Sequence, residues 1–539
     1  MKLALVQLNP IIGNLAYNYS LIETEFKRYA NDGVDLIIFS ECILTGYPPL
    51  DLLLRPDFIL SLEDYLQQLI RLTSKFPNTA LCIGTPRLLK QKLVNMAYII
   101  NNGAIIFEQF KHNLPNYDIF DEKRYFNSGT QQGVFEYNGF RIGITICEDA
   151  WSNDLSDNLD PISFFKEHPI DVLINLSASP FEHDKQQLRY EVFKKHALTL
   201  QVPVIMVNQV GGNDHLIFDG SSFCLNANGD FIAQLKSFTT DTAIIDLSKT
   251  ESPINNPLSH SKLKNIHDAL VLGIRDYVHK TGFNDVVIGL SGGIDSAVTC
   301  ALAVAALGKE HVKGVSLPSP FSSKGSLTDA KLLADTLDIH YSVIPINSLY
   351  EQFISQLNPV FKDKKADITE ENIQARCRGT LLMAIANKFN ALVLSTGNKS
   401  EIAMGYCTLY GDMCGALSVL ADVYKTEVYQ LAEFINQDDS IIPVKSITKP
   451  PSAELRPNQK DSDSLPSYDI LDPIINAYIN LSLSKDQILS DIHSDEACVD
   501  MVIKRIHFNE YKRKQAPTLL RVSTSSFVMG RRFPIAASY

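Results

Sequence analysis

The stretch VIGLSGGIDSAV occupies residues 287–298 and joins an apolar run to an alanine-rich one. Its first residues are typical of a buried strand, and those after Ser296 are typical of a helix. Two glycines allow the backbone to come close to a ligand, while the serines and the N–H groups of a starting helix can donate to phosphate oxygens. The stretch therefore predicts a pyrophosphate-binding loop between a strand and a helix.

The loop differs from the lysine-containing phosphate loop, because no Lys follows its glycines and Asp295 stands where it could bind Mg²⁺. Such a loop suits ATP that is cleaved between its α and β phosphates. A plain glycine turn is the alternative, but Ser-Gly-Gly-x-Asp-Ser is longer than a lone glycine motif. The predicted ATP contacts of the loop are Gly289, Leu290, Ser291, Gly292, Gly293, Ile294, Asp295 and Ser296.

Around this loop, short apolar runs alternate with helical stretches. The predicted strands are 286–291, 312–318, 339–346 and 391–398. Strands separated by helices are typical of a doubly wound parallel α/β sheet of the Rossmann-like kind, in which ligands bind at the carboxyl ends of the strands. Residues 439–467 are dense in Pro, Ser and charges, and we expect a mobile loop there, which could act as a lid.

The first half of the chain has its own alternating pattern, which predicts an α/β sandwich. Its expected strands are 2–8, 35–41, 80–86, 141–149, 171–177 and 202–210, and its expected helices include 18–30 and 185–199. Residues 246–265 are rich in Ser, Pro and Asn without periodicity and predict a linker. We therefore expect domains at 1–245 and 266–539.

Length and composition agree with two soluble domains. The chain has 539 residues, too many for one ordinary core, and no apolar run approaches a membrane span. A net charge of −12 argues against broad nucleic-acid binding, although Lys504, Arg505, Lys512, Arg513 and Lys514 form a basic cluster, usually solvated, that could meet phosphates. Nine cysteines without paired spacing favour a reducing cytoplasm and no structural zinc, and the N-terminus reads as a strand rather than a signal peptide.

Three residues of the first half suggest amide chemistry. Cys147 ends a predicted strand, Glu41 ends another, and Lys111 lies in a loop after a third. A carboxylate can take the thiol proton, while a lysine can favour the thiolate and stabilise an oxyanion. A buried structural cysteine is the alternative for Cys147 taken alone.

Together Glu41, Lys111 and Cys147 resemble the Glu-Lys-Cys triad of the nitrilase superfamily. The resemblance covers residues 1–245 and includes Gly46-Tyr47-Pro48, Leu114-Pro115 and the segment 175–181. It implies hydrolysis of an amide, such as that of glutamine, through a thioester. Resemblance to the glutaminase domains of this superfamily further implies three glutamine contacts, whose alternative is loop or surface polarity: Tyr117, Ser179 and Lys185.

The loop of the second half resembles that of the ATP pyrophosphatase group, and residues 265–539 resemble the NAD synthetases within it. The resemblance is carried by STGNKSEIAMGYCTLYGDMCG and DVYKTEVYQLA. It implies that Thr396, Lys425 and Ser452 contact ATP, that Asn372, Glu401, Asp412 and Lys512 contact deamido-NAD, and that Asp295 and Glu401 bind Mg²⁺. A helix cap remains the alternative for Asn372 and for Thr396 or Asn398, and a helix from this point would place Thr396 and Glu401 on one face.

The two resemblances together imply one reaction. Deamido-NAD, ATP and glutamine would give NAD, AMP, pyrophosphate and glutamate, with ammonia passing from Cys147 to an acyl-adenylate. The family resemblance also implies a homo-oligomer formed through the synthetase domain. Two alternatives stay open: an amidotransferase for another nucleotide or cofactor carboxylate, and a synthetase that uses free ammonia while the first domain serves as a scaffold.

Overall fold

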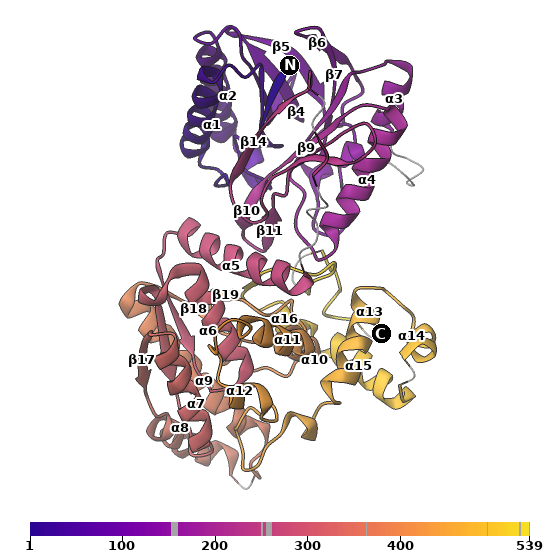
Figure 1. The fold of residues 1–539 in the computed structure, drawn as a ribbon. Coiled ribbons are helices and arrows are strands. Elements are labelled where there is room, and N and C mark those ends of the chain that lie inside the picture. The colour runs from indigo at the N-terminus through magenta and orange to yellow at the C-terminus, as the bar shows by residue number, and fades with distance from the viewer. Residues whose placement is uncertain are drawn as a thin grey trace. The chain divides into compact units, whose positions relative to one another are not determined.

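The structure, a computed structural model, describes residues 1–151, 160–249, 252–254, 261–362, 364–492, 494–527 and 530–537. The chain divides into two units, Met1–Ser261 (unit 1) and Lys262–Tyr539 (unit 2). Figure 1 shows a sandwich of sheets in the first and a single sheet flanked by helices in the second. Of the predicted linker, residues 250–251 and 255–260 lie outside the described residues.

Within the residues that the structure describes, unit 1 contains two six-stranded sheets. The first has the order β14 (Asp241–Asp246), β1 (Lys2–Gln7), β2 (Leu36–Ile38), β3 (Ala80–Leu89), β4 (Lys92–Asn101), β5 (Ala104–Phe110). The second has the order β13 (Phe231–Gln234), β12 (Phe223–Leu225), β9 (Val204–Asn208), β8 (Val172–Ser177), β7 (Phe140–Ile146), β6 (Val134–Tyr137). A separate ribbon pairs β10 (Val210–Asn213) with β11 (Leu216–Asp219).

The core of unit 1 lies between these sheets. Leu3 and Leu5 of β1 pack with Ile144 of β7 and Ile174 of β8, and all four are fully buried. Helices α1 (Leu15–Asn31) and α2 (Pro56–Thr73) cover the outer face of the first sheet, while α3 (Pro161–Glu167) and α4 (Lys185–Leu200) cover that of the second (Figure 1). The predicted α/β sandwich is confirmed.

Unit 2 contains a parallel sheet. Its order is β17 (His340–Val343), β16 (Val312–Ser316), β15 (Asp285–Gly289), β18 (Ala391–Ser395), β19 (Leu417–Ser418), β20 (Thr518–Leu519). Numbered by appearance in the chain, this is the order 3-2-1-4-5-6 of a doubly wound fold. The direction of winding reverses between β15 and β18, so their carboxyl ends form the crevice in which such sheets bind ligands. The predicted fold class is confirmed.

Helices surround this sheet on both faces. α5 (Lys262–Lys280), α6 (Ile294–Leu307) and α11 (Lys425–Ile435) contact one another, with α6 on β15 and β16. α9 (Ile368–Phe389) buries Ile373 and Leu382 against Val287 and Val393 in an apolar cluster, and α8 (Asn347–Phe361) packs Ile354 and Leu357 against the same cluster. The remaining helices are α7 (Lys324–Thr336), α10 (Lys399–Met404), α12 (Val444–Thr448), α13 (Tyr468–Ile479), α14 (Lys485–Ile492), α15 (Glu496–Phe508) and α16 (Glu510–Arg513).

Segment 439–467 differs from the mobile loop that its composition predicts. It contains α12 and the short 3₁₀ helix η5 (Asp461–Asp463), and Ile442 within it is fully buried. The Ser446 hydroxyl donates to the Gly292 carbonyl at 2.9 Å, which fastens the segment to the glycine loop. The expectation that this segment contributes no core element is therefore wrong, because its apolar and polar side chains make tertiary contacts that composition does not reveal.

Several predicted strands also end earlier than expected. β2 stops at Ile38, β7 at Ile146 and β18 at Ser395, so the polar residues that follow them lie in turns. Among the described residues, no helix is both long and apolar enough to cross a membrane.

Candidate active sites

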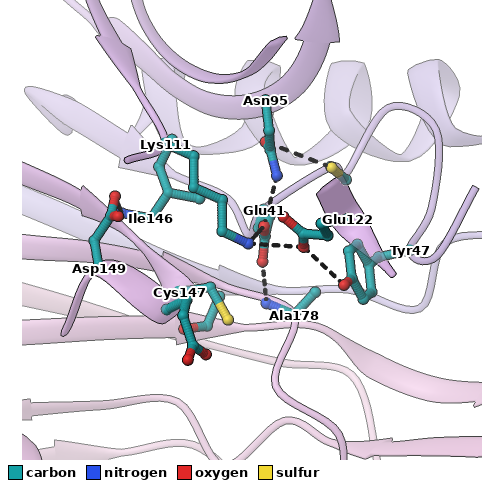
Figure 2. A network of polar contacts seen from close by, with 12 residues as sticks. Glu41, Tyr47, Asn95, Lys111, Glu122, Ile146, Cys147, Asp149 and Ala178 are labelled. Atoms are coloured by element: carbon teal, nitrogen blue, oxygen red, sulfur yellow. Dashed lines mark hydrogen bonds and ion pairs between the residues drawn. The ribbon is translucent and has the colours of Figure 1, made fainter. Parts of the chain in front are cut away.

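A buried ion pair forms the centre of the site in unit 1 (Figure 2). Glu41 lies in the turn after β2, and Lys111 directly follows β5; both are at most 1% exposed. Lys111 Nζ donates to Glu41 Oε1 at 2.8 Å. The Asn95 amide donates to the same oxygen at 2.7 Å, and the Ala178 N–H donates to Glu41 Oε2 at 3.0 Å. Three donors from separate strands and loops thus fix the carboxylate.

Cys147 lies beside this pair, in the first position of the 3₁₀ helix η3 (Cys147–Ala150). Its φ is +44°, in the left-handed region that a non-glycine residue adopts at a cost. Asp149 stabilises the turn, because its carboxylate accepts from the N–H groups of Ile146, His112 and Asn113 at 3.2, 3.0 and 2.8 Å. The turn that presents the thiol is therefore tied to the segment that follows Lys111.

The thiol and its surroundings define what the site can do. Burial raises the pKa of Cys147 well above its usual range, the charge of Glu41 raises it further, and Lys111 opposes both. The resting thiol accordingly keeps its proton, and a neighbouring base must accept it before sulfur can attack a carbonyl carbon. A carboxylate and an ammonium group at this point can supply both a base and an oxyanion partner.

Glu122 is a fourth member of this group that the sequence did not reveal. It lies in the 3₁₀ helix η2 (Glu122–Arg124), is 4% exposed, and its Oε1 accepts from Lys111 Nζ and from the Tyr47 hydroxyl, both at 2.8 Å. Burial raises its pKa to about 7, while the charge of Lys111 lowers it. No sequence signal marks Glu122, because it stands in a loop without periodicity.

The three predicted glutamine contacts lie on segments that adjoin the triad. The Tyr117 hydroxyl donates to Glu148, the residue after Cys147, at 3.0 Å. Ser179 follows Ala178, and its N–H donates to Asn208 Oδ1 at 2.8 Å. Lys185 begins α4, with Nζ 4.9 Å from the centre of the Trp151 ring and 3.2 Å from Glu182 Oε1.

Unit 2 contains a cavity of about 320 Å³ at the carboxyl ends of β15 and β18. Most of the predicted ATP and deamido-NAD residues line it: Gly289, Leu290, Ser291, Gly293, Ile294, Asp295, Ser296, Thr396, Glu401, Asp412, Lys425 and Ser452. Gly292 does not line it; its φ is +77°, and a Cβ there would meet the Ser326 carbonyl oxygen at 2.1 Å. Gly292 thus lets the loop pack against the start of α7.

Asn372 and Lys512 stand behind the cavity wall. Asn372 Oδ1 accepts from the Thr408 hydroxyl at 2.7 Å, and Lys512 Nζ donates to the Gly405 and Cys407 carbonyls at 2.7 and 2.8 Å. Both side chains therefore support the segment 405–412, which carries Asp412. The surrounding protein raises the pKa of Asp412 to about 6 through burial.

Helix boundaries settle the capping alternatives. α9 begins at Ile368 with Asp367 as its cap, so Asn372 lies inside the helix and caps nothing. α10 begins at Lys399 with Asn398 as its cap, so Thr396 precedes the helix. The expectation that one helix carries Thr396 and Glu401 on a common face is wrong, because the Asn398 side chain starts the helix later.

The predicted basic cluster near the C-terminus is not one solvated patch. Arg513 is 2% exposed and pairs with Glu510 at 2.8 Å. Arg505 donates to the Ser464 carbonyl at 3.0 Å. These two cations therefore have partners within the protein.

The charged groups at the mouth of the phosphate loop converge on Lys425. Its Nζ lies 2.5 Å from Asp295 Oδ2 and 3.6 Å from Glu401 Oε1. Burial alone would lower the pKa of Lys425, but the charges of Asp295 and Glu401 raise it, so the ammonium persists. Asn398 Nδ2 donates to Asp295 Oδ1 at 2.8 Å and orients that carboxylate.

This donor set fits Mg²⁺. Burial and the like charge of Asp295 raise the pKa of Glu401 to about 8, which indicates two carboxylates with too little positive charge between them. Magnesium is commonly bound by one or two carboxylates together with substrate phosphates and water. Asp295 and Glu401, next to a phosphate loop, meet that description.

Asp461, from η5, is a further cavity residue that the sequence did not reveal. It is 4% exposed, its Oδ2 accepts from the Tyr468 hydroxyl at 2.8 Å, and burial raises its pKa. It stands 36 positions after Lys425 in a segment whose composition suggests a loop, so only the fold brings it to this wall.

Comparisons with known proteins agree with both halves. Residues 2–252 match the carbon-nitrogen hydrolase family, and residues 266–516 match the NAD synthase family. Glutamine-dependent NAD(+) synthetases from Synechocystis sp. and Acinetobacter baylyi are 43% and 42% identical to this chain, over 100% and 99% of it and 99% and 98% of their own length.

A solved structure matches over the same extent. It is the glutamine-dependent NAD+ synthetase of Acinetobacter baumannii in complex with ADP, 40% identical, with a TM-score of 0.79 over 99% of this chain and 98% of that one. Identities of this size over the full length of each relative leave neither half unmatched. The chain belongs to the family of glutamine-dependent NAD(+) synthetases.

Proposed function

We propose that this chain converts deamido-NAD, ATP and glutamine into NAD, AMP, pyrophosphate and glutamate, with the residue roles given below. The observation that carries the proposal is the group formed by Lys425, Asp295 and Glu401 at the phosphate loop, in a chain that also buries a Lys111–Glu41 pair beside Cys147. The first group suits attack at a phosphate, and the second suits attack on an amide.

In unit 1, Glu41 accepts the thiol proton as Cys147 sulfur attacks the amide carbon of glutamine. Lys111 stabilises the negative charge that develops on the amide oxygen, and Glu41 returns the proton to the departing ammonia. A thioester remains, which water hydrolyses with Glu41 again as the base, releasing glutamate and the free thiol. The raised pKa of Cys147 supports this order of events, because it makes proton transfer part of the attack.

Glutamine binding is assigned to Tyr117, Ser179 and Lys185. Lys185 offers the cation that the α-carboxylate of an amino acid needs, and its place at the start of a 16-residue helix adds a favourable dipole. The contact of Tyr117 with Glu148 supports a place for its ring next to the thiol.

In unit 2, the carboxylate of deamido-NAD attacks the α-phosphate of ATP and forms an acyl-adenylate, while pyrophosphate leaves. The loop 289–296 binds the β and γ phosphates through N–H groups and the serine hydroxyls, while its Gly292 supports this conformation by packing against α7. Bound Mg²⁺, held by Asp295 and Glu401, would offset phosphate charge. Lys425, Thr396 and Ser452 contact ATP, and Ser452 belongs to the segment that Ser446 fastens to the loop.

The deamido-NAD site is assigned to Glu401, Asp412, Asn372 and Lys512. Glu401 and Asp412 line the cavity, which supports direct contact with the substrate. Asn372 and Lys512 hold the segment 405–412, so their effect on the substrate runs at least in part through Asp412. Ammonia released in unit 1 then attacks the acyl-adenylate and displaces AMP.

Three further features belong to this proposal. The enzyme acts in the cytoplasm, where its nine cysteines stay reduced. Residues 246–265 are a linker between the domains 1–245 and 266–539. It forms a homo-oligomer through unit 2, supported by exposed apolar side chains on α8, namely Leu349, Phe353 and Val360 at 41%, 52% and 74% exposure.

Two variants separate this proposal from its alternatives. Glutamate release and NAD formation are measured with glutamine and with ammonium chloride. Cys147→Ala is expected to lose glutamate release and glutamine-driven synthesis while keeping ammonium-driven synthesis. Lys425→Ala is expected to keep glutamate release and lose synthesis from either nitrogen source.

Other outcomes would reject specific assignments. Glutamine-driven synthesis by Cys147→Ala would make unit 1 a scaffold. Absence of NAD from the wild type with either source would mean that unit 2 amidates a different carboxylate.

A further inference from the structure

A buried carboxylate outside the cavity of unit 2 joins α10 and α11. These two helices carry Glu401 and Lys425, which are charged groups of that cavity. Asp472 lies on α13 and is 4% exposed. Its Oδ1 accepts from the Ser400 hydroxyl at 2.5 Å, and its Oδ2 accepts from the N–H and hydroxyl of Thr426 at 2.9 and 2.8 Å. Ser400 precedes Glu401 on α10, and Thr426 follows Lys425 on α11.

These contacts complete the start of α11. The first N–H groups of a helix lack partners within it, and those of α11 are supplied from outside. Lys425 N donates to Ser400 Oγ at 3.0 Å, and Thr426 N donates to Asp472. A negative charge at a helix N-terminus is favoured by the helix dipole as well. One carboxylate thus serves as the cap of α11 and as a bridge to α10.

The bridge determines where the Lys425 ammonium lies. The Lys425 side chain is 2% exposed and its Nζ already contacts Asp295 at 2.5 Å, so it has little freedom to compensate for a shift of its backbone. Glu401 stands one residue beyond Ser400, and its Oε1 is 3.6 Å from the same Nζ. A displacement of α10 against α11 would alter both distances together.

A carboxylate is required for this arrangement. The groups that contact Asp472 donate to it: the Ser400 hydroxyl to one oxygen, and the N–H and hydroxyl of Thr426 to the other. An asparagine of the same shape has a single acceptor oxygen, so its NH₂ group would replace one of these acceptors and end the donation made there. Asp472→Asn is therefore a nearly isosteric change that breaks one arm of the bridge.

We infer that Asp472 is a positioning residue of the synthetase reaction: by capping α11 and binding Ser400 of α10, it holds Lys425 and Glu401 in register around ATP. This inference rests on the proposed role of Lys425 in ATP binding. A residue that only contributed to folding would act independently of Lys425, which provides the test.

The test is a cycle of four proteins: wild type, Asp472→Asn, Lys425→Ala and the double variant. The dissociation constant of Mg²⁺-ATP is measured by calorimetry on the full chain without deamido-NAD, so that no turnover occurs. Asp472→Asn is expected to weaken ATP binding about 10-fold, the usual scale for a supporting contact. In the Lys425→Ala background the same change is expected to have a much smaller effect, namely the part that acts through Glu401, since coupled residues are not additive.

Controls separate positioning from folding. Asp469→Asn makes the same chemical change at an exposed position of α13 and is expected to bind ATP as the wild type does. Asp472→Asn and Asp469→Asn should both retain wild-type glutamate release, which reports on unit 1. If Asp472→Asn does not fold, Ser400→Ala removes the same bridge with a smaller change and is expected to weaken ATP binding in the same coupled way.

Three results would overturn the inference. If folded Asp472→Asn binds ATP as the wild type does, Asp472 does not position Lys425. If Asp472→Asn does not fold, wild-type ATP binding by Ser400→Ala has the same meaning. An undiminished loss in the Lys425→Ala background would make Asp472 structural only. Wild-type ATP binding by Lys425→Ala would instead reject the proposed ATP contact, and the inference with it.

Discussion

At the scale of single residues, the site in unit 1 places one lysine between two carboxylates. Lys111 Nζ lies 2.8 Å from both Glu41 and Glu122, and all three side chains are buried. Because these two buried carboxyl groups share one cation, ionising both of them costs free energy. The Glu122 carboxyl, rather than the better solvated surface acids, is therefore where the pH sensitivity of unit 1 should concentrate.

The first prediction concerns this carboxyl. Burial raises the pKa of Glu122 from 4.5 to about 7, so between these values the folded protein keeps a proton that the unfolded chain has lost. The free energy of unfolding must then fall as pH rises through this window, by about 3 kcal/mol for this group alone. Glu122→Gln removes the titration.

The measurement is the unfolding midpoint of unit 1 for wild type and Glu122→Gln across that pH window. The advantage of the wild type over the variant should shrink as the pH rises towards 7. Two curves that stay parallel across the window would show that Glu122 has an ordinary pKa and that the lysine neutralises it fully.

Site residues at the ends of strands could be predicted from the sequence, whereas site residues in irregular segments could not. Glu41, Lys111 and Cys147 all follow apolar runs, and the structure brings the first two into contact. Glu122 and Asp461 come from short 3₁₀ helices within irregular segments, and their function depends on long-range contacts. No local pattern of hydrophobicity marks a residue of that kind.

At the scale of elements, the glycine loop depends on close packing with α7. Gly292→Ala would need a strained φ of +77° and would place a methyl group 2.1 Å from the Ser326 carbonyl oxygen. The loop would have to move, and we expect ammonium-driven synthesis to fall about 100-fold, since a shift of roughly 1 Å at a reacting group has that effect.

A matched glycine separates strain from the clash. Gly282 has a φ of +86°, but a methyl group added to it would have no other atom within 4 Å, so Gly282→Ala carries backbone strain alone. It is expected to lose about 1 kcal/mol of stability and to keep its steady-state constants for ATP. Equal losses of activity in the two variants would mean that packing against α7 is unimportant.

Residues 454–460 provide a prediction about local structural order, which proteolysis can measure. Glu454 accepts from Ser323 N and Ser326 Oγ at 3.1 and 2.9 Å, and so fastens this stretch to the start of α7. Glu454→Ala should release it, and trypsin should then cleave after the exposed Lys460, which Asp461 follows, several-fold faster. Glu351→Ala, at an exposed position of α8, is the control and should leave this cleavage unchanged; equal rates in all three proteins would contradict the role of Glu454.

The alternation of strands and helices predicted both folds, but not every element. Strands β4 and β5 and the helices α13 to α16 were absent from the expectation. The apolar residues of α13 and α15 face a cluster assembled from distant segments, such as Ala403, Leu471 and Val499. Spacing within one segment cannot show which distant partner completes a core.

At the scale of the whole molecule, the chain combines two reactions that share ammonia. Ammonia is a product of the first reaction and a substrate of the second. A thiol site that releases ammonia would be wasteful alone, because ammonia is protonated and diluted in water. The acyl-adenylate site needs a nitrogen nucleophile in unprotonated form. Nitrogen from glutamine must therefore reach NAD within one enzyme.

One measurement tests this claim most directly. The enzyme is supplied with deamido-NAD, ATP, Mg²⁺, glutamine labelled with ¹⁵N in its amide and an excess of unlabelled ammonium chloride, and the NAD formed is analysed by mass spectrometry. We predict that NAD from the wild type carries mostly ¹⁵N, while Cys147→Ala makes unlabelled NAD only. Unlabelled NAD from a wild type that still releases glutamate would contradict the account, because the two sites would then not act in one reaction.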